Sequence, residues 1–210
     1  MILLITPIAS ERQSAMSLES TSRSVFGVSH ETIVRRILAT FDKATPADVE
    51  AGATWYGEAG ALCDTLATGP ITREHVAAVI AQLSPRTTWS RNVAGAVALI
   101  ANGPDAARSL GCIGANVDRA AVALESSDPL STINGPKTAS FARNIVGDRE
   151  AVTVDVWAAR VADLDETLLS RKGAYDAVAH AYRVAARRRG VDPATMQATT
   201  WIVARNGRAA

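Results

Sequence analysis

Apolar residues recur at helical spacing along almost the whole chain. The run from Ile33 to Phe41, for example, places its hydrophobic residues three or four positions apart, as in a helix with one buried face. Capping residues mark where such segments begin: Ser29 precedes one, and Thr45-Pro46 precedes the next. We therefore predict an all-α fold, with helices at residues 29–43, 46–67, 72–83, 88–101, 105–110, 116–126, 136–146, 155–163, 172–189 and 193–205.

Two segments fall outside this pattern. Residues 151–154 have strand-like character, but a run of four residues suits an extended connection equally well. Residues 1–24 are typical of a poorly ordered extension, within which Met16 offers an alternative start. We expect a single domain over residues 25–210.

The composition, 48% hydrophobic and 20% charged, is that of a soluble globular protein. Cys63 and Cys112 are too few for a four-cysteine iron–sulfur cluster or zinc site and give no disulfide framework, which favours a reducing cytoplasm. The histidines are scattered and not at metal-ligand spacing. No apolar run approaches the roughly 20 residues that cross a bilayer. We expect no metal, no membrane partner and a cytoplasmic location.

A net charge of +1 hides an uneven distribution. Residues 171–210 hold eight Lys/Arg against two Asp/Glu, whereas residues 1–70 hold five against eight. The basic surplus includes Arg187-Arg188-Arg189. These arginines either contact a phosphate backbone, which makes Arg187 and Arg188 candidate DNA-binding residues, or form the solvated end of a helix.

Lys137 follows a turn that opens directly into a helical pattern. Asn134-Gly135 can adopt left-handed backbone conformations at little cost. The helix that begins at Pro136 leaves backbone N–H groups free to bind an anion such as a DNA phosphate. Its dipole disfavours a cation in the first turn and lowers the pKa of Lys137, as an amine nucleophile requires. The alternative is an exposed lysine at an ordinary helical corner.

Asp155 lies in an otherwise apolar run, between Val154 and Val156-Trp157. Acids are seldom fully buried unless they are paired or functional. One interpretation is a carboxylate with a raised pKa that accepts a proton or faces a developing positive charge. The other is an aspartate that caps a helix, because a helix is expected to begin here.

Together, Gly135-Pro-Lys137-Thr-Ala139 and Val154-Asp155-Val156-Trp157 resemble the helix–hairpin–helix (HhH-GPD) DNA glycosylase superfamily, especially its endonuclease III-like members. The eighteen residues from the lysine to the aspartate match the spacing in endonuclease III. Ile80 to Trp89 is similar to the family's preceding turn, and order and spacing agree over about residues 70–165. Two features depart from the family: Ile133 stands where the first hairpin glycine lies, and the cysteines of the iron–sulfur cluster are absent.

The resemblance implies a two-lobed helical fold with a cleft between the lobes, DNA as the partner, and no cofactor except a monovalent cation that the hairpin can hold. A nucleotide rotates out of the duplex into the cleft. Lys137 attacks the sugar, and Asp155 takes a proton or stabilises positive charge. We expect a monomer. The remaining implied site residues are Arg86, Thr88, Trp89, Asn134, Gly135 and Thr138 for DNA contact, and Trp157 and Gln82 for the base pocket.

Two other functions stay open. Phage members of the superfamily are linked to thymine hypermodification, in which an amino acid or amine is joined to an activated base; Lys137 and Asp155 would then handle the incoming amine. The other is a DNA-binding module without catalysis. Whatever the function, we expect Trp55 to pack in the core, with base stacking as the alternative, and Trp201 to pack in the core, although Gln197 and Arg205 can face the cleft.

Overall fold

The computed structural model describes residues 9–207 of the chain. Over these residues it forms eleven α-helices, two 3₁₀ helices and no strand, so the all-α prediction is confirmed. The elements are α1 (Ala9–Phe26), α2 (His30–Phe41), α3 (Pro46–Leu66), α4 (Arg73–Leu83), α5 (Trp89–Asn102), α6 (Pro104–Ser109), α7 (Gly114–Glu125), η1 (Pro129–Thr132), α8 (Pro136–Val146), α9 (Val156–Val161), η2 (Glu166–Ser170), α10 (Ala174–Arg189) and α11 (Pro193–Arg205).

The capping residues read from the sequence fix the helix starts. Ser29 Oγ accepts a hydrogen bond from the Thr32 N–H at 3.1 Å, so α2 begins where it was expected. Thr45 and Asp48 cap the start of α3 reciprocally: the Asp48 N–H donates to the Thr45 hydroxyl, and the Asp48 carboxylate accepts from the Thr45 N–H. Such caps satisfy backbone groups that the first turn leaves unpaired.

Two parts of the chain correct or sharpen the sequence prediction. Residues 151–154 form an extended connection between α8 and α9 with no strand pairing. The expected extension over residues 1–24 is wrong from Ala9 onward, because α1 packs on α10 and α2. Glu19 of α1 accepts a hydrogen bond from the His30 N–H at 2.9 Å, and Ser22 is fully buried. Packing against α10 and α2 therefore orders a segment whose polar composition alone predicts no ordered helix. Residues 1–8 lie outside the described part of the chain.

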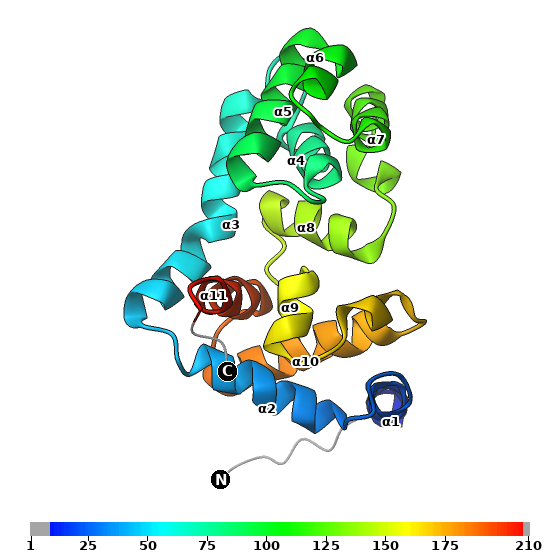
Figure 1. Ribbon diagram of the computed structural model, residues 1–210, viewed down its shortest axis with the longest axis vertical. Coiled ribbons are helices and arrows are strands. Elements are labelled where there is room, and N and C mark those ends of the chain that lie inside the picture. The colour runs from blue at the N-terminus through cyan, green and yellow to red at the C-terminus, as the bar shows by residue number, and fades with distance from the viewer. Residues whose placement is uncertain (1–8, 208–210) are drawn as a thin grey trace.

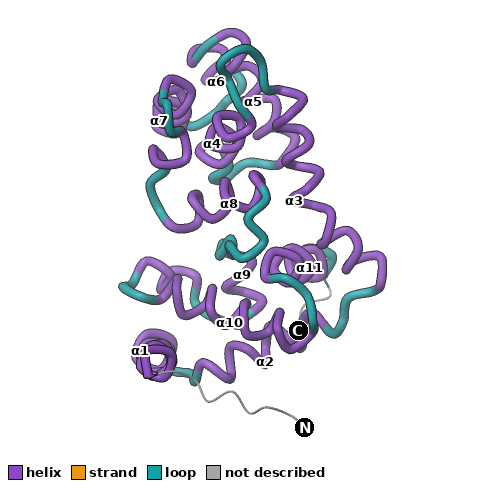
Figure 2. The backbone as a smooth tube through the Cα atoms, turned by 180° about the vertical axis from the view of Figure 1, so that it is seen from behind, coloured by secondary structure: helices purple, strands orange, loops and turns teal. Residues whose placement is uncertain are grey.

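The helices form two groups, each around its own hydrophobic core (Figure 1). The first core is built by α3 to α8 with two alanines of α11, and the second by α2, α9, α10, α11 and the extended residues 152 and 154. The long helix α3 runs along one side from the first group to the second, and the view from behind shows the same division (Figures 1 and 2). None of the helices within residues 9–207 combines the length and apolarity that a bilayer span requires.

Where α3 crosses α11, the backbones approach so closely that only glycine fits at position 52. A Cβ there would lie 2.2 Å from Thr199 Oγ1 and 2.7 Å from the Thr199 backbone nitrogen. Gly52→Ala is therefore expected to lower the free energy of unfolding by about 1–3 kcal/mol through overpacking. Gly57→Ala on the same helix meets nothing within 4 Å and is the matched control; it should raise stability by about 0.5–1 kcal/mol. Chemical denaturation measures both, and equal effects at the two positions would contradict this crossing geometry.

Candidate active site

A cavity opens between the two helical groups, and both predicted catalytic residues line it. We call its deeper part, of about 540 Å³, the inner chamber; its walls come from α3, the loop before α5, α5, α8, residues 153–157 and α11. A wider outer groove of about 840 Å³ adjoins it and extends over η2. The two parts share the following lining residues: Ser84, Thr87, Thr88, Lys137, Asp155 and Trp157.

Lys137 stands in the first turn of α8, half-buried at the junction of chamber and groove. Gly135, at the N-cap, has a φ of +93°, the left-handed region that glycine adopts without strain, and Pro136 occupies the first helical position. The predicted helix and its entry turn are thus confirmed. Burial lowers the pKa of the Lys137 amine, while the nearby Asp155 carboxylate opposes that shift. Within the described residues Lys137 forms no hydrogen bond or ion pair, so its amine is open to a ligand.

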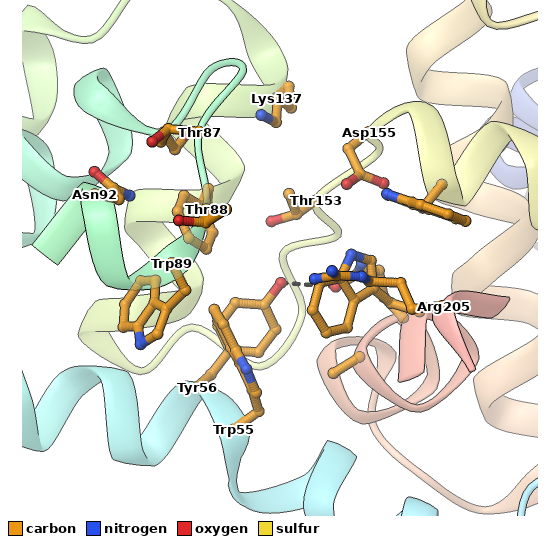
Figure 3. Close-up of a pocket in the computed structure, with 16 residues that line it drawn as sticks. Trp55, Tyr56, Thr87, Thr88, Trp89, Asn92, Lys137, Thr153, Asp155 and Arg205 are labelled. Atoms are coloured by element: carbon orange, nitrogen blue, oxygen red, sulfur yellow. Dashed lines mark hydrogen bonds between the residues drawn. The ribbon is translucent and has the colours of Figure 1, made fainter. Parts of the chain in front are cut away.

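Asp155 faces the same open space from the opposite wall (Figure 3). It caps α9, since its Oδ1 accepts a hydrogen bond from the Ala158 N–H at 2.9 Å. The capping role and the site role proposed from the sequence are therefore compatible. Burial raises the pKa of the Asp155 carboxyl; the Ala158 N–H and the charge of Lys137 act in the other direction. A half-buried acid with a raised pKa that faces an amine with a lowered pKa is suited to proton transfer in the cavity.

The extended segment that carries Asp155 is held from both sides by polar side chains. Asn144 of α8 donates its amide hydrogens to the Asp148 and Ala151 carbonyls, and its oxygen accepts from the Thr153 hydroxyl at 2.8 Å. On the other side the Tyr175 hydroxyl donates to the Val152 carbonyl at 2.8 Å and accepts from the Val154 N–H at 3.1 Å. Because Asn144 and Lys137 share α8, this anchoring fixes the aspartate relative to the lysine.

Tyr175→Phe tests that anchoring. The change keeps the ring but leaves a buried carbonyl and a buried N–H without a partner, so it is expected to cost about 1–3 kcal/mol of stability. Thermal or chemical denaturation measures the loss. A variant as stable as the native protein would show that the hydroxyl does not hold the segment.

Aromatic side chains are prominent in the rest of the chamber wall. All four tryptophans of the chain line it: Trp55, Trp89, Trp157 and Trp201. Trp55 contacts two of the others, with ring centroids 5.3 Å from Trp89 and 6.4 Å from Trp201. Trp89 and Trp157 were predicted at the site. Trp55 and Trp201 were expected in the core; both line the cavity, and Trp55 also packs against the first core.

Polar groups complete the chamber. The Tyr56 hydroxyl donates to Gln197 Oε1 at 2.7 Å, and burial raises the pKa of that phenol (Figure 3). Gln197 and Arg205 line the chamber, in line with the helix face expected from the sequence, whereas Asn92, Phe141 and Thr153 were not anticipated. Nothing in the local sequence marks these three, since they reach the cavity only through the packing of α5, α8 and the extended segment.

Arg86 lines the outer groove with a backbone conformation that is unusual for its type. Its φ is +59°, a left-handed value that costs a non-glycine residue on the order of 1–3 kcal/mol and recurs at functional sites. Gly135 and Thr138 line the same groove, and Thr88 lines both parts of the cavity. These four predicted DNA-contacting residues are therefore brought together around Lys137.

Four predicted site residues are not brought to the cavity. Gln82 is 4% exposed inside the first core, with its Nε2 unpartnered, and Asn134 lines neither part. Arg187 and Arg188 lie at the C-terminal end of α10, away from both linings. Arg188 makes two hydrogen bonds to the Glu31 carboxylate, at 2.7 and 2.8 Å, so acids from the N-terminal part of the chain offset the basic surplus. This corrects the base-pocket role given to Gln82, and it favours the helix-end interpretation of the arginines.

Within residues 9–207 no three His, Cys, Asp or Glu side chains gather in a way that could hold a metal ion. His75 illustrates a structural use of a histidine. Its Nδ1 accepts from the Thr72 N–H at the start of α4, and its Nε2 lies 2.9 Å from the Ser126 carbonyl oxygen.

The fold and the cavity define a class: an all-α protein with a lysine and an aspartate facing one tryptophan-lined chamber. The chain belongs to a family of unknown function (DUF7178), whose model matches residues 19–208. No curated protein and no solved structure is significantly similar to it.

Proposed function

We propose that the protein is a base-processing enzyme of the HhH-GPD glycosylase type. It rotates a nucleotide of the DNA out of the helix stack and breaks the N-glycosidic bond between its base and its sugar. The observation that carries this proposal is the pairing of the Lys137 amine and the Asp155 carboxylate across one open chamber. Two elements deliver these groups at the spacing of the superfamily, and the chamber lies between two helical groups, as a two-lobed glycosylase-like fold requires.

The pKa shifts of both groups favour nucleophilic chemistry. The Lys137 amine attacks C1′ of the extruded nucleotide while the bond from C1′ to the base breaks, and the electron pair of that bond leaves with the base. Asp155 removes a proton from the newly bonded nitrogen and can pass it to the departing base. The nitrogen lone pair then forms a C=N bond as the bond from C1′ to the ring oxygen breaks and that oxygen takes up a proton, which gives a Schiff base between Lys137 and the opened sugar.

The tryptophan-lined wall supports a base as the group that enters the chamber. Stacking of a base on an aromatic side chain contributes about 1–3 kcal/mol and tolerates different bases. The first turn of α8 and the strained loop at Arg86 border the outer groove beside it, where a DNA backbone would pass.

A panel of duplexes and single strands, each with one damaged or modified base, tests the proposal. We expect the native protein to release free base from at least one member, and Asp155→Asn to release it at least about a hundredfold more slowly. Salt-sensitive DNA binding without any base chemistry would instead identify a non-catalytic binding module.

One observation favours a second candidate, an amino acid or amine transfer to an activated base. The inner chamber continues beyond Lys137 and Asp155 toward α3 and α11, which leaves room for an incoming amine beside the base. The same panel, supplied with amines and with activated pyrimidines, distinguishes the two: transfer gives a heavier base that stays in the DNA, whereas cleavage gives an abasic strand.

A further inference from the structure

The inner chamber has a second polar end, opposite the catalytic pair. Lys137 and Asp155 lie at one end, and Arg205 of α11 lies at the other, next to the tryptophans (Figure 3). The chemistry proposed above assigns no role to the second end.

Arg205 is positioned as an anion-binding residue. Arg205 is exposed, and its guanidinium carbon lies 4.8 Å from the centroid of the Trp201 ring, within the range at which a cation and an aromatic face attract each other. Within residues 9–207 Arg205 has no ion pair or hydrogen bond. Arg188, by contrast, donates two hydrogen bonds to the Glu31 carboxylate. A guanidinium keeps its charge at any relevant pH, and its planar fork matches a carboxylate or a phosphate.

The chamber is also larger than one base requires. If a water molecule occupies about 30 Å³, a volume of about 540 Å³ has room for roughly 18 water-sized atoms, about twice the size of a pyrimidine. Trp55, Trp89 and Trp201 line this chamber and contact one another, with ring centroids 5.3 Å (Trp55 to Trp89) and 6.4 Å (Trp55 to Trp201) apart, so together they offer it one apolar aromatic wall.

From these observations we propose that the Arg205 end of the inner chamber binds a small planar molecule through its anionic group. The guanidinium of Arg205 pairs with a carboxylate or phosphate, and the planar body stacks on the tryptophans. This second ligand would occupy the chamber beside the extruded base. Its place beside a base rests on the proposed function, whereas anion binding at Arg205 does not depend on it.

Tryptophan fluorescence measures occupancy directly, because every tryptophan of the chain lines the chamber. Two matched probe pairs separate the two anion types: benzoate against benzamide, and thymidine 5′-monophosphate against thymidine. We expect the anionic member of one pair to bind about tenfold more tightly than its neutral partner, as hydrogen bonds to a charged group allow. Preference within the benzoate pair assigns a carboxylate, and preference within the nucleotide pair assigns a phosphate.

Arg205→Gln should remove the preference, and Arg35→Gln, at an exposed arginine on α2, should keep it. Equal binding within both pairs, a preference that survives Arg205→Gln, or no quenching by any probe at millimolar concentration would overturn the inference. Base release from DNA is measured separately on the same variants. Release without any anion preference contradicts only this inference, whereas anion preference without base chemistry contradicts only the proposed function.

Discussion

Lys137→Gln is expected to abolish the reaction, with a loss of at least about a thousandfold in rate. Removal of the residue that forms the covalent intermediate leaves only binding and positioning, and such losses are among the largest in enzymes. Single-turnover assays on the substrate found in the base panel measure the loss. Lys172→Gln is the control, because Lys172 is exposed and lines neither part of the cavity.

The same substitution should not unfold the protein. Burial lowers the pKa of Lys137 below its ordinary value of 10.5, so between the two values the folded state binds fewer protons than the unfolded state. The charged amine therefore disfavours folding, and its contribution improves as the pH rises toward 10.5. A glutamine without charge removes that cost. Strong destabilisation by Lys137→Gln would show that the lysine is structural.

Asp155→Asn is expected to lower the rate by about 10²–10⁴-fold, the usual contribution of a general acid or base. Asparagine accepts a capping hydrogen bond as well as aspartate does, so the Ala158 N–H keeps its partner and α9 should persist. The matched control is Asp128→Asn, a capping aspartate at η1 that lines neither part of the cavity and should retain full activity. Equal activity of native protein and Asp155→Asn would leave the aspartate with its capping role alone.

The pH dependence of the rate also reports on the roles of Lys137 and Asp155. Lys137 must be neutral and Asp155 ionised, so the rate should rise with pH through both pKa values. The pH–rate profile should therefore have a lower limb for ionisation of Asp155 and an upper limb for deprotonation of Lys137. Burial raises the pKa of Asp155 from 3.8 and lowers that of Lys137 from 10.5, so both limbs lie closer to neutral pH than for the free side chains. In Asp155→Asn the lower limb should disappear. The upper limb should move to lower pH, because the carboxylate no longer supports the charged amine.

Much of the fold followed from local sequence because helix periodicity and caps are local properties. The predicted ranges of α8 and α11 coincide with the structure, and the turn before Lys137 has the expected glycine conformation. α1 was missed for the opposite reason, since its polar sequence becomes helical only against α10 and α2. A contact that exists only in the folded chain leaves no local pattern.

In the site, too, some residues could be identified from local sequence and others only from tertiary packing. Lys137 and Asp155 could be identified from their contexts and spacing, but Trp55 and Trp201 could not, because a tryptophan on a helix packs into a core more often than it lines a cavity. Gln82 shows the converse error. It neighbours the loop of Arg86 in sequence, yet α4 directs its side chain into the first core. Which face of a helix meets a cavity depends on tertiary packing, which periodicity does not describe.

Borohydride trapping with peptide mapping shows whether Lys137 forms a covalent bond to the sugar during the reaction. The protein is incubated with the DNA substrate found in the base panel, reduced and digested, and the modified peptide is sequenced. We expect one covalent DNA adduct, attached to Lys137 and absent from Lys137→Gln. An adduct on Lys43 or Lys172, or base release by native protein and Lys137→Gln at equal rates, would contradict this expectation.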